Sequence, residues 1–291
     1  MFSGSIPALV TPFLNGRVAE DTFREFVEWQ IGEGSNGLVP CGTTGEVATL
    51  TREEHRQVVA AAVETSKGRV RVIAGCGTYS TLDSIERART AAEVGADAAL
   101  VVVPYYNKPS QAGLAAHFMA IADASALPIV VYNVPSRTVA DISVETLAQI
   151  AKHPRIVAIK DATGNLARVS AQRLACGEDF VQLSGNDDMA LGFNAMGGVG
   201  CISVTANVAP KLCAEFQAAM GDGRWNDAMK LQDRLYPLHA ALFSDASPGP
   251  TKYALSQVKN GFPAELRLPL VEASDASKRA VDAALDHAGL A

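Results

Sequence analysis

Short apolar runs alternate with longer amphipathic stretches along most of this chain. The runs are rich in Val, Ile and Ala, which is typical of strands buried on both faces of a parallel sheet. The stretches between them carry apolar residues at helical spacing, and the first of them ends in glycines. The sequence predicts strands at 5–11, 37–39, 70–74, 98–103, 128–132, 156–161, 180–184 and 200–204, and helices at about 19–34, 51–65, 81–94, 111–124, 144–152, 166–175, 187–196 and 210–220.

Eight strand-then-helix units in one uninterrupted stretch predict an α/β fold, the closed (β/α)8 TIM barrel. An open doubly wound sheet is the alternative, but it usually has fewer strands in one domain. No strand is evident after Gly221, where three further helices are predicted at 225–243, 251–259 and 271–288. We therefore expect a catalytic barrel at 1–222 and a C-terminal helical extension at 223–291.

Composition narrows the classes of function. The 291 residues carry a formal net charge of −6 with no run of like charges, which argues against nucleic acid or an anionic membrane as partner. The first residues lack the basic start and long apolar core of a signal peptide, and no apolar run approaches about 18 residues, so neither a leader nor a membrane span is expected. Its five cysteines form no C-x-x-C pair. They are expected to be reduced thiols of a cytoplasmic enzyme, with Cys41 a small buried thiol.

Active sites of such barrels lie in the loops at the C-terminal ends of the strands. Only Lys160 of the nine lysines is predicted at a strand end, directly after the apolar run 156–159. The residues offered by the strand ends are Thr43, Thr44, Tyr105, Tyr106, Tyr132, Arg137, Lys160, Ser184 to Asp188, Ile202 and Ser203.

Lys160 can be interpreted in two ways. A lysine at a strand end usually extends its ammonium to water. An ammonium is costly to desolvate, however, so buried lysines favour the neutral amine, which is a nucleophile. Lysine among tyrosines and threonines, without a paired set of metal ligands, suggests Schiff-base chemistry on a carbonyl substrate.

Two neighbours fit that chemistry. Tyr132 ends the adjacent strand and offers a phenol for proton transfer, although it is equally compatible with a core aromatic with a wet tip. Gly42 to Gly45 offer backbone N–H groups and the hydroxyls of Thr43 and Thr44 to a carboxylate, although an ordinary capped turn has the same pattern.

Other kinds of site are less consistent with the sequence. The five histidines are scattered, with no pair spaced four apart beside a glutamate, so no metal site is predicted. Gly75-Cys76-Gly77 lacks the third glycine of a dinucleotide fingerprint. Gly185 to Asp188 suggest an N-capped helix start more than a cation site.

Six motifs in register together identify a resemblance over Ile6 to about Pro210. They are Gly42-Thr43-Thr44-Gly45-Glu46, Tyr105-Tyr106, Tyr132-Asn133-Val134-Pro135-Ser136-Arg137-Thr138, Ile159-Lys160-Asp161, Leu183-Ser184-Gly185, and Gly200 to Asn207. This ordered set resembles the dihydrodipicolinate synthases, which belong with N-acetylneuraminate lyase to the pyruvate-dependent class I lyases.

The resemblance implies condensation of pyruvate with L-aspartate-4-semialdehyde and cyclisation to 4-hydroxy-tetrahydrodipicolinate, the first committed step of lysine and diaminopimelate biosynthesis. It implies that the reaction needs no cofactor and that the protein is a homotetramer. By resemblance, Lys160 would form the imine and Tyr132 would be the general acid and base. Thr43 and Tyr106 would complete a proton relay with Tyr132, and Tyr106 would reach into the site of the neighbouring subunit. Thr44, the backbone of Ile202 and Gly185 would hold pyruvate, and Arg137 the carboxylate of the aldehyde.

The resemblance also indicates where an L-lysine effector would bind. His55 and Tyr105 match the lysine-inhibited members, and Asp83 replaces a glutamate. Val47, Arg52 and Tyr79 stand where Ser, His and Asn are expected. We therefore expect lysine inhibition to be weak or altered.

Two rival functions remain. One is an aldolase for N-acetylneuraminate or a 2-keto-3-deoxy sugar acid, but a sugar aldehyde offers no carboxylate to Arg137. The other is a non-catalytic sensor on the same barrel, since a fold does not determine a function. A binding protein has no need of a nucleophile such as Lys160.

Overall fold

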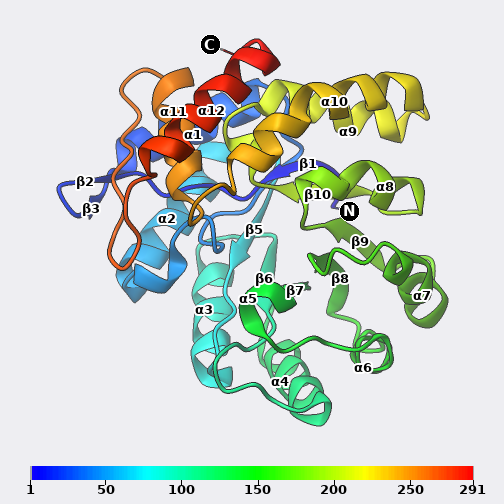
Figure 1. Ribbon diagram of the computed structural model, residues 1–291. Coiled ribbons are helices and arrows are strands. Elements are labelled where there is room, and N and C mark those ends of the chain that lie inside the picture. The colour runs from blue at the N-terminus through cyan, green and yellow to red at the C-terminus, as the bar shows by residue number, and fades with distance from the viewer. Residues whose placement is uncertain (1, 291) are drawn as a thin grey trace.

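Eight parallel strands form a barrel in the computed structural model, which describes residues 2–290 (Figure 1). Their order around the sheet is β1-β10-β9-β8-β7-β6-β5-β4. The ring closes between β4 and β1 through a parallel bridge of Ala8 with Val39. The strands are β1 (Gly4–Pro7), β4 (Gly37–Leu38), β5 (Arg71–Gly75), β6 (Ala98–Val102), β7 (Ile129–Asn133), β8 (Ile156–Asp161), β9 (Val181–Ser184) and β10 (Gly200–Ser203). The predicted barrel is confirmed.

Helices surround the barrel and alternate with its strands (Figure 1). Several begin at a Ser or Thr whose side chain accepts an N–H of the first turn; Thr51 and Glu54 form a full capping box. The helices of this layer are α1 (Glu20–Gly32), α2 (Arg52–Ser66), α3 (Thr81–Glu93), α4 (Gln111–Ala124), α6 (Val144–Ile150), α7 (Ala167–Cys176), α8 (Ala190–Ala195) and α9 (Pro210–Gly221).

The alternation of side chains along the strands creates two cores. On β7, Ile129 and Val131 pack outward against the helices, whereas Val130 and Tyr132 belong to the cluster inside the barrel. The inner cluster is small and apolar, with Ala158, Leu183 and other strand residues. Any polar side chain that points inward must therefore lie near the end of its strand, where the barrel opens.

Several short elements were not predicted. A hairpin of β2 (Phe13–Leu14) and β3 (Arg17–Val18) turns at Asn15 and Gly16, which both have positive φ. Asn-Gly is the preferred pair for such a turn and was the signal that pattern analysis missed. The helix α5 (Pro135–Thr138) and the 3-10 turns η1 (Val47–Thr49) and η3 (Thr205–Asn207) lie in the loops after strands. The helix predicted at 187–196 is divided into the 3-10 turn η2 (Asp187–Met189) and α8.

The C-terminal part consists of α10 (Trp225–Ala241), α11 (Gly249–Val258) and α12 (Asp275–Ala288). Helix α10 packs against both α9 and α12 (Figure 1). The third helix begins four residues later than the predicted 271, because Ser274 caps it. We propose that 223–291 extends the barrel of 1–222 and does not fold on its own, since its polar groups bond into the loops of the barrel.

A buried ion pair joins the C-terminal part to the loop after β4. Lys252 of α11 is fully buried, and its Nζ lies 2.6 Å from Glu46 Oε1 and donates to the carbonyl of Glu265 at 2.7 Å. The backbone N–H of Arg267 donates to the other oxygen of Glu46 at 3.1 Å. Burial lowers the pKa of Lys252, and the charge of Glu46 opposes that effect.

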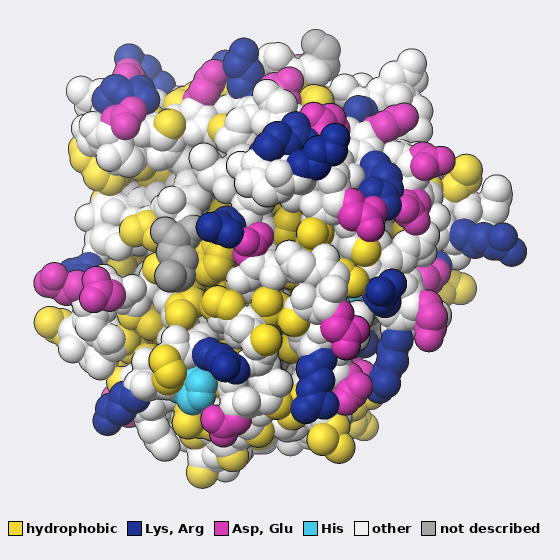
Figure 2. All heavy atoms as spheres, turned by 180° about the vertical axis from the view of Figure 1, so that it is seen from behind, with side chains coloured by type: hydrophobic (Ala, Val, Ile, Leu, Met, Phe, Trp, Pro, Cys, Tyr) yellow, Lys and Arg dark blue, Asp and Glu magenta, His cyan; other side chains and the backbone are white. Residues whose placement is uncertain are grey.

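Charges of both signs are interspersed over the face in Figure 2, with no broad patch of one sign. None of the helices within 2–290 has the length and hydropathy that crossing a membrane requires.

We expect Lys252→Met to lower the free energy of unfolding by about 3–5 kcal/mol, because it leaves the buried Glu46 carboxylate without its partner. Urea denaturation followed by circular dichroism measures the loss. The double variant Glu46→Gln/Lys252→Met should lose less, since no lone charge stays buried. Lys278→Met is the control, because it removes a more exposed ion pair with Glu272 and should cost at most about 1 kcal/mol. A single variant as stable as the parent would contradict the prediction.

Candidate active site

The register of β7 with β8 brings the two principal candidates together. Tyr132 pairs with Lys160 across the strands, and both point to the inside of the barrel. Lys160 Nζ lies 4.2 Å from the centroid of the Tyr132 ring. The amine and the aromatic ring that bears the phenol are therefore direct neighbours, as strand order alone predicted.

Lys160 is buried, with 6% of its surface exposed. Within 2–290 it forms no ion pair, whereas the other buried lysine, Lys252, is held by Glu46. Lys252 was predicted on a helix, where periodicity alone gave no sign of its burial. The ion pair with Glu46 fixes the amine of Lys252 as a structural group, whereas the amine of Lys160 has no carboxylate partner within the described residues.

A cavity of about 450 Å³ opens above this pair. Six of the eight residues predicted for catalysis or substrate binding line it: Lys160, Tyr132, Thr43, Thr44, Arg137 and Gly185. The rest of the wall comes from Val134, Ser136, Ala162, Asn186, Asp187, Asp188, Val204, His239, Ala240, Phe243 and Ser247.

The loop after β4 presents Thr43 and Thr44 to the cavity. The N–H groups of Gly45 and Glu46 bond back to the carbonyls of Gly42 and Thr43 at 3.1 Å. Those of Thr43 and Thr44 bond to no backbone carbonyl of 2–290. They are therefore available, together with the two hydroxyls, to an anion such as a carboxylate.

Gly185 allows the loop after β9 to approach the lysine. A Cβ added there would lie 2.7 Å from the Cβ of Ala162 and 3.1 Å from Cε of Lys160. Its N–H donates to the carbonyl of Asp161 at 2.7 Å. Only glycine fits this position without displacing the wall beside the amine.

Arg137 lies on α5 at the exposed side of the cavity. Within 2–290 no carboxylate forms an ion pair with it, whereas other arginines such as Arg168 and Arg267 do form ion pairs. A free guanidinium at this place can bind a carboxylate in a two-pronged arrangement.

Two predicted residues do not reach this cavity. Tyr106 is 91% exposed, and its positive φ of 66° turns it out from the loop after β6. Ile202 is fully buried inside the barrel, where it pairs with Ile6. Its predicted role concerns its backbone and not this side chain.

Asp187, one of the residues predicted at the end of a strand, proves to be a buried carboxylate in the wall of the cavity. Its Oδ2 accepts the N–H groups of Val204 and Thr205 at 2.8 and 3.1 Å, and its Oδ1 accepts the hydroxyl of Ser203. The interpretation of this stretch as an N-cap of its own helix was wrong: the carboxylate caps the turn after β10. It thereby ties the ends of β9 and β10 together.

The C-terminal extension supplies the remaining wall, including His239 and Phe243. His239 Nδ1 is hydrogen-bonded to Thr205 Oγ1 at 2.7 Å. Burial lowers the pKa of His239, and the nearby Asp187 and Asp188 oppose that shift. These residues could not be found from strand ends, because they come from α10 and the segment after it.

The candidate effector residues lie around α2, α3 and the loop after β6. Asp83 is bound on both sides, its Oδ1 by Arg52 and its Oδ2 by Arg87, each at 3.1 Å. Both oxygens of this carboxylate are therefore already neutralised by guanidinium groups.

Two further effector candidates are in contact with each other. The rings of Tyr79 and Tyr105 meet edge to face with centroids 5.4 Å apart. Burial raises the pKa of Tyr105. His55 is instead buried, where it donates to the carbonyl of Gly75 at 2.8 Å, and burial lowers its pKa.

The cysteines are free thiols, and four of the five are buried. Burial raises the pKa of Cys76 to about 12 and that of the neighbouring Cys41 as well. Cys41 is therefore a buried apolar side chain, as predicted, and not a thiolate nucleophile.

The chain is similar to known proteins over its whole length. Residues 1–288 match the model of the dihydrodipicolinate synthetase family. A 4-hydroxy-tetrahydrodipicolinate synthase of Rhizorhabdus wittichii is 66% identical over 291 residues, the full length of both chains.

Solved structures give the same result. A dihydrodipicolinate synthase of Acinetobacter baumannii in complex with pyruvate superposes with a TM-score of 0.97 at 41% identity, over the whole of both chains. One from Cyanidioschyzon merolae with lysine bound has a TM-score of 0.96 at 37% identity, covering 100% of this chain and 99% of its own. The present chain belongs to the dihydrodipicolinate synthetase family.

Proposed function

We infer that this protein is a Schiff-base-forming lyase that joins pyruvate to L-aspartate-4-semialdehyde. The product, after cyclisation, is 4-hydroxy-tetrahydrodipicolinate, the first committed intermediate of lysine and diaminopimelate biosynthesis. The observation that carries the inference is Lys160, a buried amine without an ion pair, beside Tyr132 in a cavity with anion-binding groups.

The amine of Lys160 adds to the ketone of pyruvate, and loss of water gives a protonated imine. The imine draws electrons from the methyl group, which loses a proton to form an enamine. The enamine carbon then attacks the aldehyde of the second substrate. Finally, the amine of that substrate adds to the imine carbon and displaces Lys160, which closes the ring. The protonated imine is the electron sink, so the reaction needs no cofactor.

Proton transfer to and from the carbinolamine oxygen is assigned to Tyr132. Thr43, which lines the same cavity, is the next member of the relay. We assign the third place to Tyr106 of a neighbouring subunit in a homotetramer, because in one chain this tyrosine is almost fully exposed and turned away from its own cavity.

Two groups of donors would hold the carboxylates of the substrates. Thr44 and the loop N–H groups, with Gly185 and the backbone of Ile202, are assigned to pyruvate. The unpaired Arg137 at the exposed side is assigned to the carboxylate of the semialdehyde. Sugar aldehydes lack this carboxylate, and with the comparisons this favours the synthase over an aldolase for N-acetylneuraminate or a sugar acid.

We also propose a cytoplasmic location, which the five free thiols support, because thiols persist in a reducing compartment.

Borohydride reduction in the presence of pyruvate tests the function directly. We expect mass spectrometry of peptides to locate one reduced adduct on Lys160, and Lys160→Ala to form none. The control is Lys230→Ala, which removes a lysine that is 79% exposed and should leave the adduct unchanged. An adduct on another lysine, or none in the parent protein, would refute the Schiff-base assignment.

Tyr132→Phe should slow turnover by about 10²-fold or more, because it removes the proposed acid and base but keeps the ring beside the amine. Trapping of the pyruvate imine should still occur. Steady-state rates and borohydride trapping on the same samples measure both effects. Tyr236→Phe, which alters an exposed tyrosine of α10, is the matched control. An unchanged turnover number in Tyr132→Phe would argue against its role.

We expect L-lysine to inhibit weakly, because Arg52 and Arg87 already occupy the carboxylate of Asp83, and Tyr79 adds bulk where Asn is expected. Inhibition is measured as the rate against lysine concentration. The triple variant Val47→Ser/Arg52→His/Tyr79→Asn should become more sensitive, since it frees one oxygen of Asp83 from Arg52 and removes the bulk of Tyr79. Submillimolar inhibition of the parent protein would contradict the prediction.

A further inference from the structure

The two residues that follow the catalytic candidates face the opposite way. Asn133 and Asp161 pair with each other in the β7–β8 register, one position after Tyr132 and Lys160. Because side chains alternate along a strand, they point out of the barrel toward the helices. Both are buried, at 0% and 4% exposure, so their polar atoms depend on partners within the protein.

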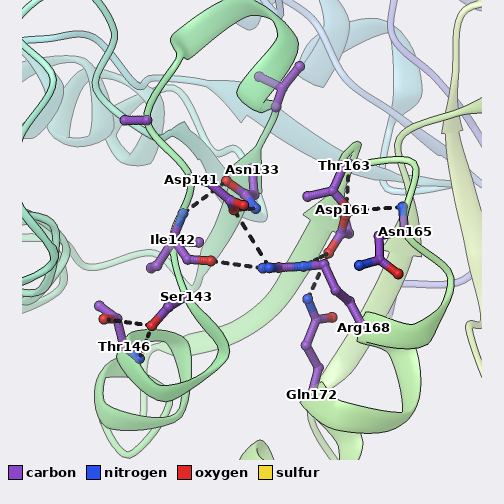
Figure 3. Close-up of polar contacts among 12 residues, drawn as sticks. Asn133, Asp141, Ile142, Ser143, Thr146, Asp161, Thr163, Asn165, Arg168 and Gln172 are labelled. Carbon is purple, nitrogen blue, oxygen red and sulfur yellow. Dashed lines mark hydrogen bonds and ion pairs between the residues drawn. The ribbon is translucent and has the colours of Figure 1, made fainter.

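Arg168 of α7 connects these partners (Figure 3). Its Nε donates to Asp161 Oδ2 at 3.2 Å, and its Nη1 lies 3.7 Å from Asp141 Oδ1. Asp141 Oδ1 also accepts the amide of Asn133 at 2.7 Å. We call these four residues, Asn133, Asp141, Arg168 and Asp161, the outer clamp.

The outer clamp encloses the segment that carries Arg137. Asn133 stands before this segment, and its Oδ1 accepts the N–H of Ile142 after it, at 3.3 Å. Arg168 Nη2 donates to the carbonyl of the same Ile142 at 2.8 Å. Both ends of the Arg137 segment are therefore tied to one point on the outer face of the barrel.

The other arm of the outer clamp holds the end of β8. Asp161 Oδ1 accepts the N–H and the hydroxyl of Thr163 at 2.9 and 2.6 Å, and its Oδ2 also accepts Gln172 at 2.7 Å (Figure 3). These bonds determine the course of the backbone directly after Lys160.

We propose that Arg168 is a positioning residue for the reaction, which holds the Lys160 strand end and the Arg137 segment at a constant separation. No member of the outer clamp lines the cavity, so Arg168 acts through the residues that it supports. The meaning of that separation rests on the proposed function, in which Lys160 carries pyruvate and Arg137 binds the aldehyde.

Arginine suits this position better than lysine. Its planar guanidinium donates in several directions and here reaches acceptors on two chain segments, whereas an ammonium is a compact point charge. A misplacement of about 1 Å between reacting groups costs about 10²-fold in rate.

The test compares Arg168→Met with Arg168→Lys. Arg168→Met should lower kcat about 10-fold to 10²-fold and raise KM for the aldehyde more than KM for pyruvate. Arg168→Lys should recover part of both losses, since it can replace one arm of the outer clamp. The matched control is Arg224→Met: Arg224 also bridges two carboxylates, of Asp222 and Asp227, but is half-exposed and should not change the kinetics.

Two further variants distinguish a loss of positioning from the effect of a buried unpaired charge and from a failure to fold. Asp161→Asn/Arg168→Met leaves no unpaired buried charge, since the remaining carboxylate of Asp141 is half-exposed, and it should stay impaired because the connection is still broken. Asp141→Asn alters a half-exposed carboxylate and so should fold; we expect a raised KM for the aldehyde and an unchanged rate of imine formation with pyruvate.

Parental kcat and KM values in Arg168→Met would overturn the proposal. So would full recovery in the double variant, or, if Arg168→Met does not fold, an unchanged KM for the aldehyde in Asp141→Asn. Borohydride trapping of the parent protein in the same series distinguishes this outcome from failure of the proposed function. If the proposed function fails, the parent protein forms no adduct on Lys160. If only the role of Arg168 fails, the adduct still forms.

Discussion

The parallel pairing of β7 with β8 is the interaction on which the site depends. It places Tyr132 beside Lys160 on the inner face and Asn133 beside Asp161 on the outer face. A slip of one residue would exchange the two faces and turn the amine into the helix layer. The hydrogen bonds that hold this register thus define both the reacting pair and its support.

The loops above the strands need their own restraints, because some strands are very short. The strand β4 has two residues, yet it is followed by the loop with Thr43 and Thr44. Buried polar groups supply these restraints. Glu46, in the loop after β4, forms an ion pair with Lys252, and Asp187 caps the turn after β10. An unsatisfied buried carboxylate would be costly, so each of these groups favours one loop conformation over others.

The pattern of apolar positions predicts the barrel well because strands buried on both faces and amphipathic helices leave distinct periodicities. The same pattern predicts Lys160 and Tyr132, since a strand end determines where a side chain lies. It does not predict contacts that depend on the packing of distant segments. Lys252 and His239 lie on helices whose orientation toward the barrel the periodicity leaves open, and both prove to be buried. The Asn15-Gly16 hairpin was missed although its turn signal is strong, because strands of two residues show no periodicity.

The close approach of Gly185 to Lys160 has a consequence for changing the substrate range of this protein. Gly185 has no side chain to shorten and no space for a Cβ, so substitution at this part of the wall cannot make room for a larger ketone. Phe243 and Ser247 also line the cavity, and they lie on the segment between α10 and α11, outside the ring of strands. Widening or reshaping the cavity for a bulkier donor should therefore begin in the C-terminal extension, where a substitution leaves the register of the reacting pair intact.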